Sequence, residues 1–79
     1  YPNPFNPSTK IRFDLPATSR TTLKVFNLLG QEVATVVNGV LSAGRHTVDW
    51  NANDMPAGVY MYRLGSGASV ATRKLVIAK

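Results

Sequence analysis

Apolar and charged residues alternate strictly near the start of the chain. Ile11, Phe13 and Leu15 are apolar, and the residues between them are charged. Alternation with a period of two is typical of a strand that buries one face and exposes the other. We therefore expect a strand that begins at Thr9 and ends at Pro16, because proline lacks the N–H that a β-ladder requires.

Five further stretches have strand character. In the first of them, Leu23 and Val25 are expected to point inward between polar neighbours. A stretch near the C-terminus, residues 59–64, is apolar or aromatic on both faces, as in a central strand. The further strands are expected at residues 20–27, 32–37, 45–51, 59–64 and 68–78.

In the last of these stretches, strict alternation would place charged and apolar residues on the same face. Leu75 and Ile77 share their face with Arg73 and Lys79. A buried face rarely holds unpaired cations, so we expect a β-bulge near Arg73 and Lys74 that separates the charges from the apolar anchors.

Glycine and asparagine separate the predicted strands. Gly30, Gly44 and Gly58 are expected in turns at positive φ, where a Cβ atom would cost energy. The pair Asn38-Gly39 lies between apolar residues, which is the strongest short signal for a two-residue hairpin. A further tight turn is expected at residues 65–67.

These elements predict the fold class. No window of the chain has the 3.6-residue apolar period of a helix. The segment from Asp54 to Tyr60 resembles a tyrosine corner, in which a Tyr near the start of a strand donates a hydrogen bond back across a loop. We predict an all-β protein, an immunoglobulin-like antiparallel β-sandwich of six to seven short strands.

Length and composition narrow the class of protein. The 79 residues suffice for one small domain, and the absence of cysteine excludes disulfides and thiolate chemistry. No stretch has the roughly 20 apolar residues of a membrane span, and no export signal is expected at the start of the chain. The net charge is +5, but the cations are spread along the chain, so we expect no nucleic-acid partner. They are Lys10, Arg12, Arg20, Lys24, Arg45, Arg63, Arg73, Lys74 and Lys79.

Candidate catalytic chemistry is sparse. His46 is the one histidine, and it alternates in phase with Val48 and Trp50, which is typical of a packed side chain. The four carboxylates have no spacing that indicates a paired acid and base, and no nucleophile motif is present. We therefore expect no enzyme activity and no cofactor.

The sequence offers weak candidates for two kinds of binding site, a calcium site and a carbohydrate site. Asp49, Asn51 and Asn53 match the first positions of a calcium loop, but Asp54 stands where the turning glycine belongs, so turn hydrogen bonds are the preferred interpretation. A carbohydrate site needs exposed aromatic residues in a row. The candidates, Trp50, Tyr60 and Tyr62, lie in predicted strands of a thin core, where burial is expected.

Several blocks of the chain, taken together and in order, resemble one known family. The blocks are residues 1–9 (YPNPFNPST), 11–13 (IRF), 25–33 (VFNLLGQEV), 43–50 (AGRHTVDW), 55–64 (MPAGVYMYRL) and 74–77 (KLVI). The pattern resembles the type A C-terminal sorting domain of the type IX secretion system. It is also similar to the immunoglobulin-like domain of flagellar hook-capping proteins.

The resemblance implies that residues 1–79 form a single C-terminal sorting domain, the tail of a larger exported protein. Such a domain is a non-catalytic signal that directs the cargo N-terminal to it from the periplasm through an outer-membrane translocon. A sortase-like cysteine protease then cuts ahead of the domain and attaches the cargo to the surface of a Gram-negative cell. Two alternatives remain: an accessory or carbohydrate-binding module of a secreted hydrolase, and an assembly domain of the flagellar-cap type.

In this family the final strand is prominent in recognition. We expect Arg73, Lys74 and Lys79 to face the translocon while Leu75 and Ile77 anchor the strand. The alternative is a last core strand with basic protection of its edge. The full candidate recognition set is Arg73, Lys74, Leu75, Val76, Ile77, Lys79 and Arg63.

Arg63 has two interpretations. It is either a recognition charge or an ion-pair partner of Glu32 or Asp49. Other residues of the matched blocks are expected to be structural, and Pro2-Asn3-Pro4 is expected to pair as a first strand. The expected structural residues are Pro2, Asn3, Pro4, Gly30, Gly44, Trp50, Gly58 and Tyr60.

Overall fold

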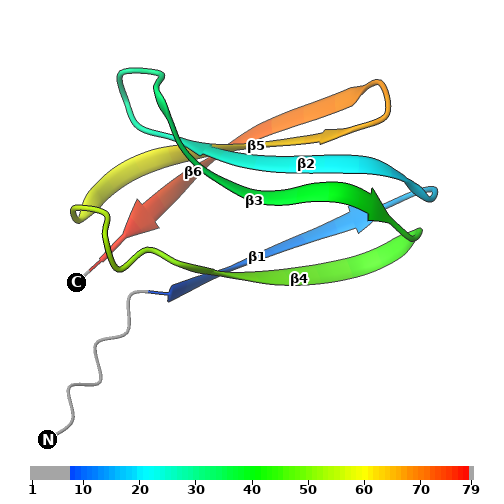
Figure 1. The fold of residues 1–79 in the computed structure, drawn as a ribbon, viewed down its shortest axis with the longest axis horizontal. Coiled ribbons are helices and arrows are strands. Elements are labelled where there is room, and N and C mark those ends of the chain that lie inside the picture. Colours follow the sequence, from blue (N-terminus) through cyan, green and yellow to red (C-terminus); the bar gives the residue numbers. More distant parts are fainter. Residues whose placement is uncertain (1–7, 79) are drawn as a thin grey trace, which may run out of the picture.

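The computed structural model describes residues 8–78, which form six β-strands and no helix (Figure 1). The strands are β1 (Ser8–Leu15), β2 (Ser19–Phe26), β3 (Glu32–Leu41), β4 (Gly44–Asn51), β5 (Gly58–Ser66) and β6 (Ser69–Ile77). Strands β3, β2, β5 and β6 pair in that order in one sheet, and β1 pairs with β4 in the other. All neighbouring strands are antiparallel.

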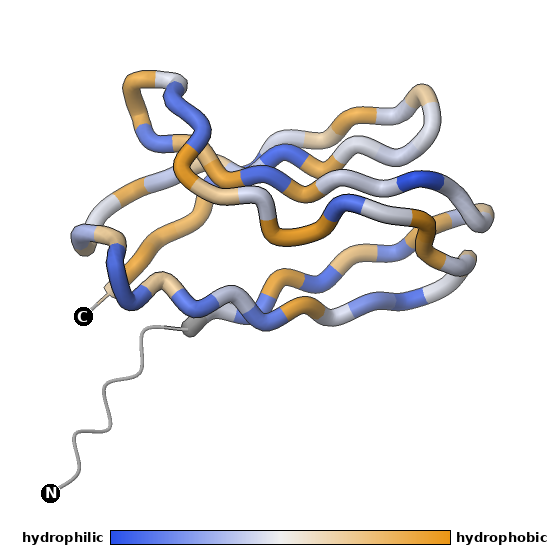
Figure 2. Tube along the Cα trace, viewed as in Figure 1, coloured by the Kyte–Doolittle hydropathy of each residue, from blue (hydrophilic) through white to orange (hydrophobic). Residues whose placement is uncertain are grey.

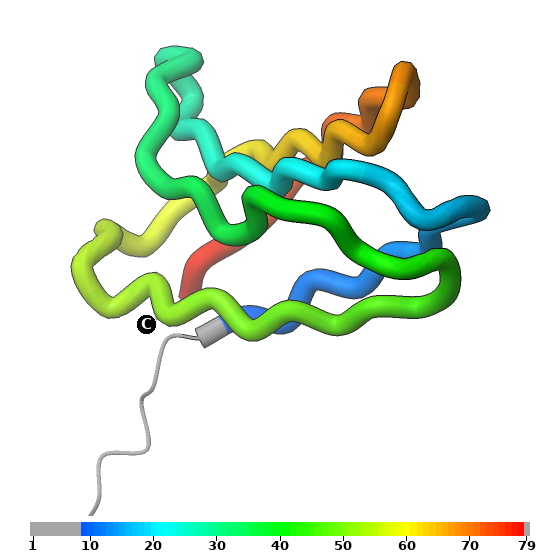
Figure 3. The backbone as a smooth tube through the Cα atoms, turned by 45° about the vertical axis from the view of Figure 1, so that its right-hand side comes forward, coloured from blue at the N-terminus to red at the C-terminus, as the bar shows by residue number. Residues whose placement is uncertain are grey.

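The two sheets lie face to face as two layers (Figure 3). The connection at Ser42 and Ala43 carries the chain from β3 in the larger sheet to β4 in the smaller one. The prediction of an all-β sandwich of six to seven strands is confirmed with six in the described part of the chain.

Hydrophilic and hydrophobic residues alternate along the strands of both layers (Figure 2), and the buried residues form the core. Ile11 and Leu15 of β1 are buried, as the alternation predicts, and Leu23 and Val25 of β2 are completely buried. A cluster of buried side chains extends from β2 to the β4–β5 loop and to the C-terminal strand. Its members are Val25, Ala52, Tyr60, Leu75 and Ile77.

The turn between β2 and β3 follows from one asparagine and one glycine. The Asn27 side-chain oxygen accepts hydrogen bonds from the backbone N–H groups of Leu29 (2.9 Å) and Gln31 (3.0 Å). Gly30 has a φ of 84°, a conformation that a Cβ atom disfavours. The expected positive φ is also found at Gly44 and Gly58, so these glycine predictions are confirmed.

The predicted hairpin at Asn38-Gly39 is wrong. These residues lie inside β3, opposite Thr22 and Thr21 of β2, and Gly39 does not have a positive φ. The Asn38 side-chain oxygen instead accepts a hydrogen bond from Arg20 Nη2 at 2.9 Å. Pairing along the full length of β2 therefore outweighs the local turn preference.

The expected bulge in β6 is also wrong, because its pairing with β5 is continuous from Gly58 opposite Ile77 to Ser66 opposite Ser69. The register irregularities lie in β3, opposite Leu23–Lys24 and Val25–Phe26 of β2. A bulge sets two residues against one on the partner strand and alters the alternation of faces. This fits the burial pattern of β3, in which two pairs of adjacent residues, Val33 with Ala34 and Val36 with Val37, are half-buried.

The proline-rich opening of the chain and Lys79 at the other end lie outside the described residues. The predictions for Pro2, Asn3, Pro4 and Lys79 therefore stay predictions.

Candidate functional site

Strand β6 forms one edge of the four-stranded sheet. It pairs with β5 along one side, and no described residue pairs with its other side. Leu75 and Ile77 are 9% and 4% exposed, whereas Val76 between them is 56% exposed. The strand therefore combines two buried anchors with an open edge, the arrangement that strand addition requires.

The two cations of β6 lie on opposite faces of the sheet. Because side chains alternate, Arg73 shares the inner face with Leu75 and Ile77, and Lys74 points outward. Both are exposed. The structure thus places the two predicted recognition charges on the two sides of one strand.

Arg73 is tolerated on the inner face because the smaller sheet does not cover it there. It lines a hollow of about 520 Å³ at the open side of the sandwich. The hollow is bounded by Arg12, Phe13 and Asp14 of β1 and by Tyr62 and Leu64 of β5, with Ala71 and Arg73 of β6. The charge therefore stays in contact with water, and no bulge is needed to turn it outward.

Arg63 makes neither of the expected ion pairs. Glu32 forms an ion pair with Lys24 at 3.5 Å, and Asp49 forms one with Lys10 at 2.9 Å. The Arg63 guanidinium carbon instead lies 4.6 Å from the centre of the Phe26 ring, a cation–π contact. The contact fixes the position of the guanidinium on the surface and leaves its charge available.

Glu32 is held by its neighbours in the charged state. A hydrogen bond from Thr35 Oγ1 at 2.8 Å is the main cause of a pKa below the ordinary value, and the nearby charge of Lys24 adds to it. A lowered pKa stabilises the fold above the ordinary glutamate pKa, and this stabilisation is lost as the pH falls through the folded-state value. The contribution is thus present at neutral pH and disappears in acid.

We expect Glu32→Gln to reduce stability at pH 7 and to have progressively less effect as the pH falls below the ordinary range of glutamate. Urea unfolding of both proteins across this range measures the difference. A difference that stays constant down to about pH 2, where glutamate is protonated, would show that the charge of Glu32 is not involved.

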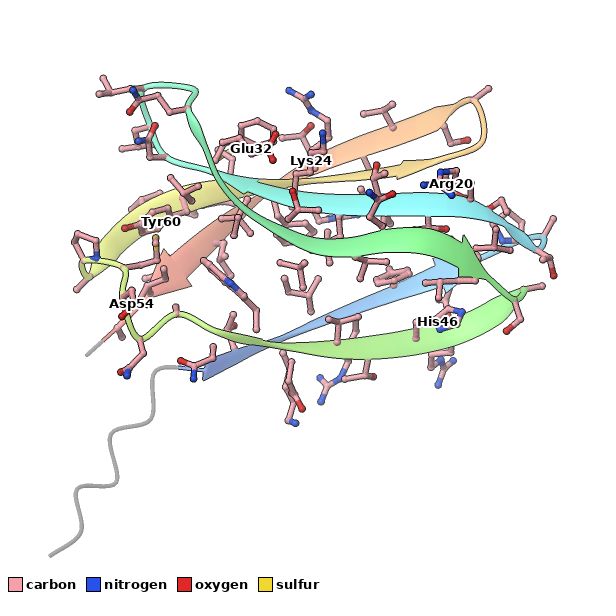
Figure 4. All side chains as sticks on the ribbon, in the orientation of Figure 1. Arg20, Lys24, Glu32, His46, Asp54 and Tyr60 are labelled. Carbon is pink, nitrogen blue, oxygen red and sulfur yellow. The ribbon has the colours of Figure 1, made fainter. Side chains whose placement is uncertain are left out.

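The predicted tyrosine corner is confirmed. The Tyr60 hydroxyl donates a hydrogen bond of 2.8 Å to the backbone oxygen of Pro56, across the loop that precedes β5 (Figure 4). Tyr60 is 6% exposed and belongs to the core cluster. Trp50 packs against the same cluster, as expected of a structural residue. The corner ties the β4–β5 loop to the strand that follows it.

Removing this hydrogen bond is expected to destabilise the domain. Tyr60→Phe removes the donor of this part-buried hydrogen bond, at a cost of about 1–2 kcal/mol. Tyr62→Phe is the matched control, since the Tyr62 hydroxyl donates no hydrogen bond within residues 8–78. Chemical unfolding of both variants checks the prediction, and equal midpoints would contradict it.

The candidate catalytic, calcium-binding and sugar-binding residues make packing and turn contacts. His46 stacks on Phe13, with ring centres 5.5 Å apart, and its Nε2 lies 2.8 Å from the Ser42 backbone oxygen. The Asn51 side-chain oxygen accepts the N–H of Asn53 at 2.9 Å, as a turn asparagine does. Tyr62, like the other two aromatic candidates for a sugar site, packs against the core cluster.

Within residues 8–78, no three His, Cys, Asp or Glu side chains come together as metal ligands would. The same residues contain no helix of the length and apolarity that a membrane crossing needs.

Sequence reasoning missed the outer surface of the four-stranded sheet. The pairing sets Phe26, Met61 and Lys74 side by side, and Lys24, Arg63 and Thr72 in the next row, all on the side away from β1 and β4. Leu28 and Leu29 in the adjacent turn are 70% and 84% exposed. The sequence signal for this surface was the pair of leucines in a predicted turn. The sequence alone does not show which strands lie beside that turn.

Comparison with known proteins gives one match. The model of a family described as secretion system C-terminal sorting domain matches residues 1–78. No curated protein and no solved structure matches the chain.

Proposed function

The chain belongs to the family of secretion system C-terminal sorting domains, which serve the type IX secretion system, and we propose that the outer-membrane translocon recognises it through strand β6. A domain of this family is a sorting signal and a non-catalytic tag. It implies export through the secretion system to the cell surface or beyond. The match to residues 1–78 carries the assignment.

In the proposed pathway residues 1–79 are one domain at the C-terminal end of a larger cargo in a Gram-negative bacterium. The cargo lies N-terminal to the domain and reaches the periplasm by its own signal. The folded domain then brings the cargo to the translocon, and a sortase-like cysteine protease cuts ahead of the domain and attaches the cargo to the surface.

Recognition through β6 is proposed to occur by strand addition. A partner strand hydrogen-bonds to the open edge while the side chains of β6 supply specificity. Arg73 and Lys74 would meet the partner on opposite faces, and the buried Leu75 and Ile77 hold the strand in place. Val76 offers an exposed apolar contact. Arg63 lies on β5, one strand in from the edge, opposite Thr72 of β6.

The role as a signal is tested by attaching residues 1–79 to the C-terminus of a periplasmic fluorescent reporter in a host with a functional type IX system. The proposal predicts surface or medium fluorescence that depends on the translocon, with loss of the mass of the domain after cleavage. Fluorescence trapped in the periplasm of both the host and a translocon-deficient strain would contradict the proposal. Export with the domain still attached would contradict only the cleavage step.

A further inference from the structure

The outer face of the four-stranded sheet has an uneven charge. Four cations from three strands lie on it, and Glu32 is the one carboxylate there among the described residues. The cations are Arg20, Lys24, Arg63 and Lys74. Figure 4 shows Lys24 and Glu32 on the side of the sheet away from β1 and β4. We call this surface, with the apolar residues between its cations, the cationic outer face.

Apolar side chains lie among these charges. Phe26 and Met61 are neighbours in the register, and the next row pairs Val59 with Val76, which are 40% and 56% exposed. A hollow of about 230 Å³ opens beside them, lined in part by residues of the β2–β3 turn. Figure 3 shows this turn standing away from the sheet, on the side opposite β1 and β4. The walls of the hollow include Phe26, Leu28, Gly30, Met61, Arg63 and Thr72.

Arg63 lines this hollow, and its guanidinium is positioned by the Phe26 ring. Within residues 8–78 no carboxylate lies in ion-pair distance of it. Arginine, methionine and aromatic residues are the types most enriched at protein interfaces, and desolvated arginines are frequent binding hot spots. The face therefore has the composition of an interaction surface and a net positive charge, with only Lys24 of its four cations in an ion pair within residues 8–78.

We propose that the cationic outer face binds a protein segment that inserts one large apolar side chain into the hollow and sets carboxylates against Arg63 and Lys74, since Lys24 already pairs with Glu32. Charge complementarity identifies the partner as acidic, since the face presents four cations to one carboxylate. The hollow is lined mainly by β2, the β2–β3 turn and β5, with Thr72 of β6, and the face shares Lys74 and Val76 with the recognition strand. Binding of the acidic segment is proposed independently of the sorting role.

The hollow favours a protein over an anionic bilayer. Phe26 and Met61 form its floor between Leu28 on the turn and Arg63 on β5. An apolar side chain of a partner can enter such a recess, whereas the flat surface of a bilayer would leave it unfilled. Leu29, at the tip of the turn and 84% exposed, would lie at the rim of the interface.

The probe for this proposal is a displayed library of random dodecapeptides, selected on residues 1–79. We expect selected peptides to carry Asp or Glu around a Leu or Phe, and to bind more weakly as salt is added. Backbone NMR shifts on titration should fall on residues 26–30, 61–63 and 72–74. Arg63→Gln should weaken binding by about fivefold or more, while Arg45→Gln, which removes the same charge from β4, should not.

Three results would overturn the proposal. The first is a selection without acidic and apolar enrichment, and the second is binding that Arg63→Gln and Arg45→Gln affect equally. The third is Arg63-dependent binding to phosphatidylglycerol vesicles with no selected peptide, which would assign the face to a membrane.

Discussion

Replacing Ile77 by aspartate is expected to unfold the domain, whereas the same change at the neighbouring Val76 is expected to leave it folded. Ile77 is 4% exposed and belongs to the core cluster, so the substitution removes a buried side chain and places a carboxylate in its site. The combined cost is about 4 kcal/mol or more. A chain of 79 residues has about 4–12 kcal/mol of total stability, so the loss is at least about a third of it and, at the lower end of the range, all of it.

Val76 is the matched position on the other face of β6. Its side chain is 56% exposed, and an aspartate there is expected to cost about 1 kcal/mol or less. Urea unfolding followed by circular dichroism and by Trp50 fluorescence measures both variants. Similar stabilities for the two variants would show that β6 is not anchored as described.

The second large effect is expected from Leu23→Ala. Leu23 lies in the middle of β2 with no exposed surface, between β3 and β5. The change leaves a cavity in a thin core and should cost about 2–5 kcal/mol. Val40→Ala is the control, because Val40 is 66% exposed on β3. A loss for Leu23→Ala no larger than for the control would contradict the assigned core.

The elements that the sequence predicted correctly depend on residues close together in the chain. The alternation of Leu23 and Val25 sets the buried face of β2 directly. Tyr60 and Pro56 are near neighbours, so the tyrosine corner could be inferred from the loop alone. Gly30 is likewise explained by the turn that contains it.

The failed predictions involve partners that are far apart in the sequence. Asn38-Gly39 has a strong turn preference, but pairing with β2 keeps it extended. The bulge at Arg73 was predicted from the alternation of residues. Alternation does not show that β1 leaves the inner face of β6 uncovered at the open side of the sandwich. The uncovered side depends on the widths of the two sheets.

The candidate recognition strand was partly predictable. Its buried anchors follow from the apolar pattern of the chain end, and both Leu75 and Ile77 are buried. The contact of Arg63 with Phe26 was not predictable, because it joins β5 to β2 across the sheet. A single sequence shows which residues of a strand share a face more readily than it shows which strands pair with it.

The central claim is that the translocon recognises the edge of folded β6, and charge reversal at Arg73 and Lys74 tests it most directly. Both side chains are exposed, so Arg73→Glu/Lys74→Glu should keep the fold, with an unfolding midpoint close to that of the wild type. The control, Lys10→Glu/Arg45→Glu, makes the same change in net charge on β1 and β4.

The measurement is translocon-dependent export of a periplasmic reporter that carries each variant, made beside the unfolding curves. We expect export to fall by about tenfold or more for the β6 variant and to be unchanged for the control. Recognition of Arg73 and Lys74 implies acidic groups on the translocon, and like charges across an interface cost several kcal/mol. Undiminished export of the folded β6 variant, or equal loss in both variants, would contradict recognition through this strand.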